Sequence, residues 1–281
     1  MNDGPKQRVM TLIAIALTFG SGAMDVTSFT RLGNVLTSVM TGNIVLWGLA
    51  AARGSATLAS HSTVAIAGYI AGVAAATWIA HGFTGKADAG KPGDGKPGDG
   101  KASDGKAGDG KTGRGKTGRG KADGAGERRA SGQPSHITRP FLAELVLLAG
   151  FTVGWEISGA RPAGWAQFCL LAVAAAAMGV QSSAVRDMGM TEVSTTFLTG
   201  TLTGLVSKLV RPGERTSYAS RRLGVLIGLA AGAGLGGLLI ATAAAAAPVL
   251  PLAAITATLV LAFAPPHWVP PAKVRRGAPP D

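Results

Sequence analysis

Long, nearly uncharged apolar runs constrain this chain more than any other feature. About eight of them recur along its 281 residues, and most approach the roughly 20 residues that a helix needs to cross a bilayer core. Charged residues make up only 15% of the chain, against roughly 25% in soluble domains. The sequence therefore predicts an all-α, polytopic transmembrane helix bundle of about eight spans, at residues 9–29, 35–52, 63–80, 140–157, 166–185, 193–210, 223–243 and 251–264.

One polar insert interrupts the apolar runs. Residues 83–138 contain a five-residue repeat rich in Gly, Lys and Asp, which cannot bury apolar surface and is predicted to be a disordered, low-complexity loop. The insert separates spans one to three, within residues 1–82, from spans four to eight, within residues 139–266. A basic, Pro-rich tail follows at residues 267–281.

The net charge of +12 reflects Lys and Arg at the ends of the predicted spans and in the insert. In the short loops these residues gather on one side, which predicts that both termini are cytoplasmic. A nucleic-acid partner is not expected, because no aromatic residues alternate with the basic ones. The expected partners are the lipid bilayer and a small solute or ion, and the sequence specifies no oligomeric state.

Two polar segments break the apolar pattern, and they resemble each other. The first contains Asp25 and, in span two, Thr41-Gly42-Asn43; the second contains Gln181 and, in span six, Thr199-Gly200-Thr201. We interpret them as equivalent parts of two four-span repeats, with Asp25 opposite Gln181. Because four spans separate the copies, the repeats are expected to share one membrane orientation.

Glycine ridges support the same repeat. Small residues at every fourth position let two transmembrane helices approach closely. Such ridges occur in spans three and seven, the corresponding spans of the two halves. Their members are Gly68 and Gly72 in span three, and Gly224, Gly228, Gly232 and Gly236 in span seven.

These segments resemble the YoaK family of bacterial integral membrane proteins (domain of unknown function 1275). The shared blocks are G-x-x-D-x-x-S-F, at residues 22–29, with M-T-G-N, at 40–43, and A-M-G-x-Q-x-x-A-V, at 177–185, with T-T-x-x-T-G-T, at 195–201. The chain departs from the family pattern at Ser182, where the family often has Asn, and in the insert. The resemblance implies a multi-pass protein of the bacterial cytoplasmic membrane and no particular reaction.

The leading hypothesis is a transporter or permease-like protein. Asp25, Asn43, Gln181 and the two Thr-Gly segments would face a shared site, where Asp25 binds a proton or cation. The alternative is a non-transporting membrane scaffold or interaction protein, in which the glycine ridges make helix contacts and the polar groups of the repeat lock the fold. The two Thr-Gly segments also allow a simpler interpretation, in which Gly42 and Gly200 pack closely and the threonine hydroxyls bond to carbonyls of their own helix.

Other chemistry is not predicted. Glu144 and Glu156 lie near span ends and are expected at the membrane interface. The four histidines share no metal-ligand spacing, and no serine or cysteine nucleophile motif occurs, so we expect neither a metal, a cofactor nor an enzymatic activity.

Overall fold

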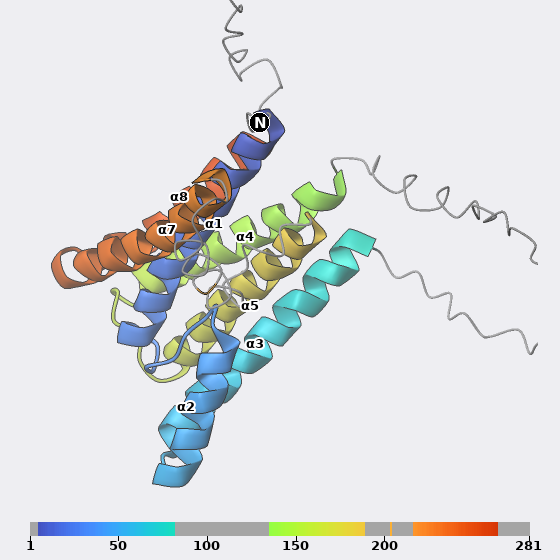
Figure 1. Cartoon of the computed structure of the whole chain (residues 1–281). Coiled ribbons are helices and arrows are strands. Elements are labelled where there is room, and N and C mark those ends of the chain that lie inside the picture. Colours follow the sequence, from blue (N-terminus) through green and yellow to red (C-terminus); the bar gives the residue numbers. More distant parts are fainter. Residues whose placement is uncertain (1–4, 82–134, 189–202, 204–215, 264–281) are drawn as a thin grey trace, which may run out of the picture. The chain divides into compact units, whose positions relative to one another are not determined.

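The computed structural model describes residues 5–81, 135–188, 203 and 216–263. All of them belong to one compact unit, Met1–Gly82 with Pro134–Asp281, and the other unit, Phe83–Gln133, lies outside the described residues. Every regular element in the described part is helical (Figure 1). The elements are α1 (Pro5–Arg31), α2 (Met40–Arg53), α3 (Ala56–His81), α4 (Ser135–Ile157), α5 (Trp165–Asp187), α7 (Thr216–Thr242), the 3-10 helix η4 (Ala244–Ala246) and α8 (Val249–Phe263).

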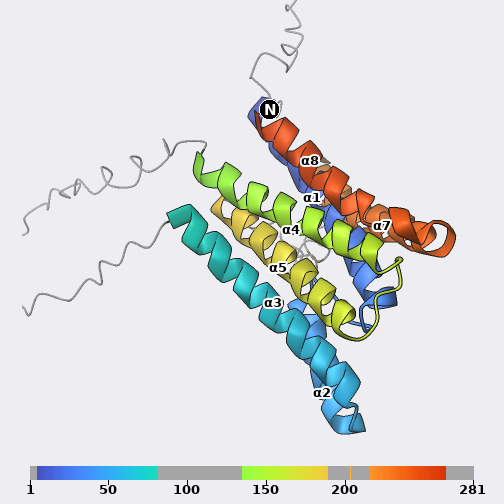
Figure 2. The ribbon, with the colours of Figure 1, turned by 180° about the vertical axis from the view of Figure 1, so that it is seen from behind.

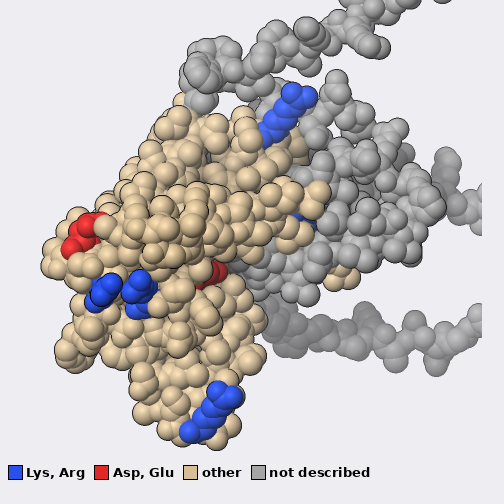
Figure 3. Space-filling view, turned by 90° about the vertical axis from the view of Figure 1, so that its left-hand side faces the viewer, with Lys and Arg blue, Asp and Glu red and all other residues tan. Residues whose placement is uncertain are grey.

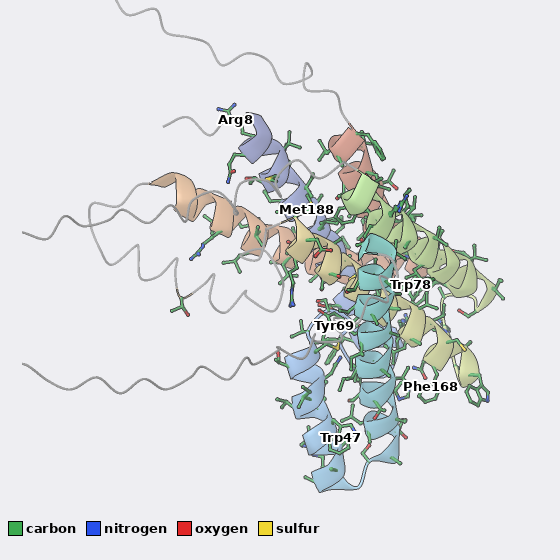
Figure 4. All side chains as sticks on the ribbon, turned by 90° about the vertical axis from the view of Figure 1, so that its right-hand side faces the viewer. Arg8, Trp47, Tyr69, Trp78, Phe168 and Met188 are labelled. Carbon is green, nitrogen blue, oxygen red and sulfur yellow. The ribbon has the colours of Figure 1, made fainter. Side chains whose placement is uncertain are left out.

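Six helical stretches in the described part are long and apolar enough to cross a membrane. They are Gln7–Arg31, Ala56–Ala80, Thr138–Ile157, Trp165–Asp187, Arg222–Thr242 and Ala244–Phe263. Their surface suits lipid: Trp78 on α3 (labelled in Figure 4) has 60% of its surface exposed, and most of the described face in Figure 3 is uncharged, with a few separate charged side chains. The multi-pass helical class is therefore confirmed, with six candidate spans within the described residues.

The predicted second span, residues 35–52, is wrong, because its helix starts late. α2 begins only at Met40 and has 14 residues, so it rises about 21 Å and cannot cross a core about 30 Å thick. It ends at Gly54, whose left-handed φ of 63° lets the chain turn directly into α3. The predicted sixth span, residues 193–210, lies outside the described residues except for Thr203.

The helices pair in two parallel couples. α1 runs parallel to α7, since successive positions of one meet successive positions of the other. These pairs are Ile15 with Gly228, Phe19 with Gly232 and Ala23 with Gly236. α3 runs parallel to α5, as shown by the pairs Gly68 with Ala172, Gly72 with Ala176 and Thr77 with Ser183. In both ribbon views α3 lies beside α5 (Figures 1 and 2).

The two couples run in opposite directions. The start of α5 meets the end of α1, where the Gln167 amide donates to the Arg31 carbonyl oxygen at 2.9 Å. Farther along α5, Gln181 meets α1 two to four turns earlier, at Leu17 and Ser21. α1 and α5 are therefore antiparallel. This contradicts the expectation that the two halves share one orientation, which had counted residues 35–52 as a full span.

Backbone contact explains the glycines of both couples. A Cβ at Gly72 would overlap the carbonyl group of Ala176, and one at Gly232 would overlap that of Phe19. Gly224 differs slightly, since a Cβ there would lie 3.0 Å from a side-chain carbon of Ile15. With no side chain in the way, the helix backbones approach within direct contact, which gains dispersion energy along the whole seam.

The remaining helices cover these couples. α4 packs on α5, α8 packs on α1, and α4 also contacts α8. The buried face of α4 holds the largest core side chains, Phe141, Phe151 and Trp155. Trp155 donates its indole N–H to the Ala244 carbonyl oxygen at 2.9 Å, which ties the end of α4 to η4.

Gly232 and Gly234, two residues apart on α7, test whether the backbones of α1 and α7 are in contact. Gly232→Ala should lower the free energy of unfolding by about 1–3 kcal/mol, because the new methyl group collides with the backbone of α1. Gly234→Ala is the matched control: nothing lies within 4 Å of its Cβ, so it should be neutral or stabilise the helix by up to about 1 kcal/mol. The measurement is unfolding of the detergent-solubilised protein. Equal effects of the two substitutions would contradict the assigned seam.

Candidate functional site

The candidate site is built around a buried stretch of non-helical chain. Between α1 and α2, residues 32–39 form turns and bends, although Leu32, Val35 and Thr37 have no exposed surface. Backbone N–H and C=O groups at such a depth need partners, because neither a helix ladder nor water supplies them. Side chains of α1 and α2 provide these partners.

Asp25 on α1 binds the last part of this loop. Its Oδ1 accepts the backbone N–H groups of Thr37 and Ser38, both at 2.8 Å, and the Thr37 hydroxyl at 3.0 Å. Its Oδ2 accepts the Ser38 hydroxyl. Four donors therefore converge on one carboxylate, which matches the approximate number of lone pairs it can offer.

Asn43 and Ser28 bind the middle of the loop. The Asn43 amide forms a two-point contact with Leu36, accepting its N–H at 2.9 Å and donating to its carbonyl oxygen. Ser28 donates to the Val35 carbonyl oxygen at 2.8 Å. Asn43 has no exposed surface, so these bonds are shielded from solvent and replace the missing helix ladder.

A second contact holds the start of the loop against α3 and α5. Gly33, at φ 99°, adopts a backbone conformation that favours glycine, and a Cβ there would overlap the ring of His61. The His61 ring stacks on Phe168, with centroids 4.3 Å apart, and faces the Gln167 side-chain oxygen at 3.3 Å. The loop thus rests against both helix couples.

Gln181 is buried on α5 and bonds to α1. Its amide donates to the Leu17 carbonyl oxygen and the Ser21 hydroxyl, each at 3.1 Å. Ser21 lies one turn before Asp25, so the two predicted polar residues contact the same helix at neighbouring levels. Asp25 and Gln181 are each only 8% exposed.

The remaining predicted site residues do not all lie beside Asp25. Thr41 is exposed, contrary to its expected place facing the site, because the first turn of α2 directs it outward. Gly42 contacts Leu36 and Val39 of the loop at ordinary van der Waals distances. Thr199, Gly200 and Thr201 lie outside the described residues.

Sequence reasoning missed the hydroxyl partners of Asp25. Thr37 and Ser38 precede the Met-Thr-Gly-Asn block and were counted as part of an apolar span. Their signal is local: a polar pair just ahead of a helix start offers backbone and hydroxyl donors to a buried carboxylate.

Glu144 is buried among the helices. It is 1% exposed in α4, and its Oε2 has no hydrogen-bond partner among the described residues. Its burial follows from its position on the helix: it lies three residues after Phe141 and four before Leu148, on the face that enters the core. Glu156, at the end of the same helix, is exposed.

The arrangement contains two buried carboxyl groups in different surroundings. Asp25 accepts hydrogen bonds from two loop residues, and Glu144 offers a carboxyl oxygen with no partner among the described residues. Within the described ranges no three His, Cys, Asp or Glu side chains cluster to hold a metal ion.

Comparison with known proteins gives a consistent picture. The model of the family described as "Protein of unknown function (DUF1275)" matches residues 13–93 and 123–262. The chain is 26% identical over 199 residues to the UPF0700 transmembrane protein YoaK of Bacillus subtilis (strain 168). That match covers 71% of this chain and 66% of the relative, just under two thirds of its length. No solved structure matches.

The Asn43 contact can be tested against a neighbour in the same helical turn. Asn43→Ala leaves the buried N–H and carbonyl of Leu36 without their partners, so the free energy of unfolding should fall by about 2–4 kcal/mol. Thr41→Ala, at an exposed position, should change it by less than about 0.5 kcal/mol. Denaturant unfolding in detergent measures both values, and a Thr41 effect as large as that of Asn43 would refute the assigned contacts.

Proposed function

We propose that this chain, which belongs to the DUF1275 family and matches a transmembrane relative, is a transporter of a small solute or ion. The observation that carries the proposal is the antiparallel arrangement of α1 and α5, which we take as equivalent helices, together with the buried non-helical segment 32–39 that Asp25 binds. Transporters are commonly built from inverted repeats, with the substrate site at broken helices between them.

Matching glycine contacts support an inverted repeat. On α1, Gly22 meets the carbonyl of Leu229 and the N–H of Ala233; on α5, Gly179 meets the same two groups of Tyr69 and Val73 (Figure 4 labels Tyr69). The contacts agree atom for atom: a Cβ built at either glycine would lie 3.0 Å from the amide nitrogen. α1 with α7 thus has the same packing as α5 with α3.

The same contacts revise the register of the proposed repeat. Aligning Gly22 with Gly179 brings Asp25 opposite Ser182, one residue from the pairing with Gln181 expected from the sequence. The two halves then contain three spans each, with α1, α3 and α4 in the first and α5, α7 and the span Ala244–Phe263 in the second. An odd number of spans reverses the orientation of the second half.

In this proposal Asp25 holds the loop of residues 32–39 in place and releases it during transport, a role we call the latch. All four of its donors come from residues 37 and 38, so a cation can reach the carboxylate only after this part of the loop moves away. Release of the loop would expose the carboxylate, the Asn43 amide and unpaired backbone groups together. Exchange of loop contacts for solute contacts is a two-state change of the kind that alternating access requires.

A membrane scaffold is the second candidate, and saturation of the polar groups favours it. Asp25, Asn43 and Gln181 all bond to protein atoms in the described structure. In a scaffold these bonds would lock the helices permanently, and no solute would cross. No enzymatic step enters either candidate.

Asp25→Asn tests the latch. An amide replaces one acceptor oxygen by a donor, which faces the N–H and hydroxyl donors of residues 37 and 38. Uptake by proteoliposomes of a panel of labelled amino acids, sugars, organic acids and alkali cations is measured under an imposed proton gradient. We expect at least one solute to accumulate, and Asp25→Asn to reduce its rate at least tenfold.

Asp187→Asn is the matched control, since Asp187 is exposed at the end of α5, and it should retain the wild-type rate. Uptake that is unchanged in Asp25→Asn removes the latch from the mechanism. Absence of uptake for the whole panel, with both variants folded, favours the scaffold.

A further inference from the structure

We propose that Glu144 is a proton-exchanging site in the membrane-embedded part of the protein. Neither the family match nor the repeated polar segments assigns a role to this residue. The proposal rests on the carboxyl group of Glu144, on its depth in the bundle and on what surrounds it. Its place in a transport cycle rests on the proposed function, whereas proton exchange itself does not.

Glu144 is the exception among the buried carboxyl groups described. Asp25 receives four hydrogen bonds, whereas Oε2 of Glu144 receives none from the described residues. An ionised carboxylate in such a place loses its hydration without compensation, which is among the costliest arrangements in a protein. A carboxyl group without a fixed partner is therefore suited to gain and lose a proton as its surroundings change.

The level of Glu144 in the bundle is set by the antiparallel pair α4 and α5. A Cβ at Gly154 would lie 2.8 Å from the Leu170 side chain, near the short connection between the two helices. Ten residues back along α4 is Glu144, and ten residues forward along α5 is Val180, each about 15 Å away. Glu144 therefore lies at the level of Gln181, which in turn bonds to α1 at Ser21.

The ligand class follows from the same surroundings. On its own helix face Glu144 lies between Phe141 and Leu148, which supply no oxygen ligands. A metal cation would need several oxygen ligands, which these two apolar side chains do not offer, so the position suits a proton.

The charged and titratable groups on the neighbouring helices are few. α8 has none. On α5 they are Arg186 and Asp187, both exposed in the last turn, and the exposed Cys169. α3 contributes Tyr69, His81 at its end, and His61, which binds Gln167 near the start of α5. On α4 itself Arg139 and Glu156 are exposed.

In this proposal Asp25 and Glu144 have different roles. Asp25 holds the loop, and Glu144 carries the proton at a nearby level, with Ser21 one turn from Asp25 and bonded to Gln181 between α1 and α5. Movement of the loop and protonation of Glu144 can be coupled through this part of the bundle, because Glu144 lies on α4, which packs on α5, and α5 contacts α1, which holds the loop.

Labelling with dicyclohexylcarbodiimide tests the proposal on the wild-type protein in lipid nanodiscs. This apolar reagent adds to protonated carboxyl groups, and peptide mass spectrometry locates the product. We expect Glu144 to be labelled, at a rate that falls at least tenfold between mildly acidic and mildly alkaline pH. Glu156, exposed on the same helix, is the internal control and should remain unlabelled. No labelling of Glu144 at any pH, or a rate independent of pH, overturns the proposal.

Proton flux into vesicles holding a pH-sensitive dye separates this proposal from the proposed function. Glu144→Gln, which mimics the neutral acid, should keep the wild-type thermal midpoint and reduce flux at least tenfold, whereas Glu156→Gln should leave flux unchanged. Labelling of Glu144 without any wild-type flux supports the proton site and contradicts transport. Flux that survives in Glu144→Gln contradicts the proton site and leaves transport standing. If Glu144→Gln does not fold, the wild-type labelling decides.

Discussion

The four hydrogen bonds from residues 37 and 38 to Asp25 are the interaction on which the described structure depends. They allow a stretch of non-helical backbone to be buried where a bilayer would otherwise demand a continuous helix. Without them, the chain after α1 would have two poor choices: exposing unpaired polar groups to lipid, or extending a second full span. The short α2, its direction and the number of spans all follow from this one contact.

Close backbone contacts at glycines determine how the helices are arranged around this non-helical stretch. Contact between backbones in the α1–α7 and α3–α5 couples leaves no room for side chains at these glycines, so the two helices of each couple pack in direct contact. The loop touches both couples, through Asp25 on α1 and through the His61 ring on α3. A displacement of the loop would therefore act on both helix couples. A gate requires such a connection, and a permanently locked scaffold requires it equally.

The two buried carboxyl groups described, Asp25 and Glu144, differ in their hydrogen-bond partners. Asp25 is fully bonded and Glu144 is not, although both are more than nine-tenths buried. A bonded carboxylate holds structure, whereas an unbonded one is free to respond to its surroundings. This difference gives the proposed transporter separate groups for holding the loop and for carrying a proton.

Local composition was enough to determine much of this protein. Apolar runs, low charge and four-residue glycine spacing predicted a helical membrane protein and the ridges at Gly72 and Gly232, because hydrophobicity and side-chain size act locally. The motif blocks at residues 22–29 and 177–185 indicated its family by resemblance. Tertiary structure decided the rest. Residues 35–52 are apolar enough to be taken for a span, and only the long-range bonds of Asp25 and Asn43 break them. That break leaves α2 too short to be a span, and the contacts of α4 rather than its composition bury Glu144.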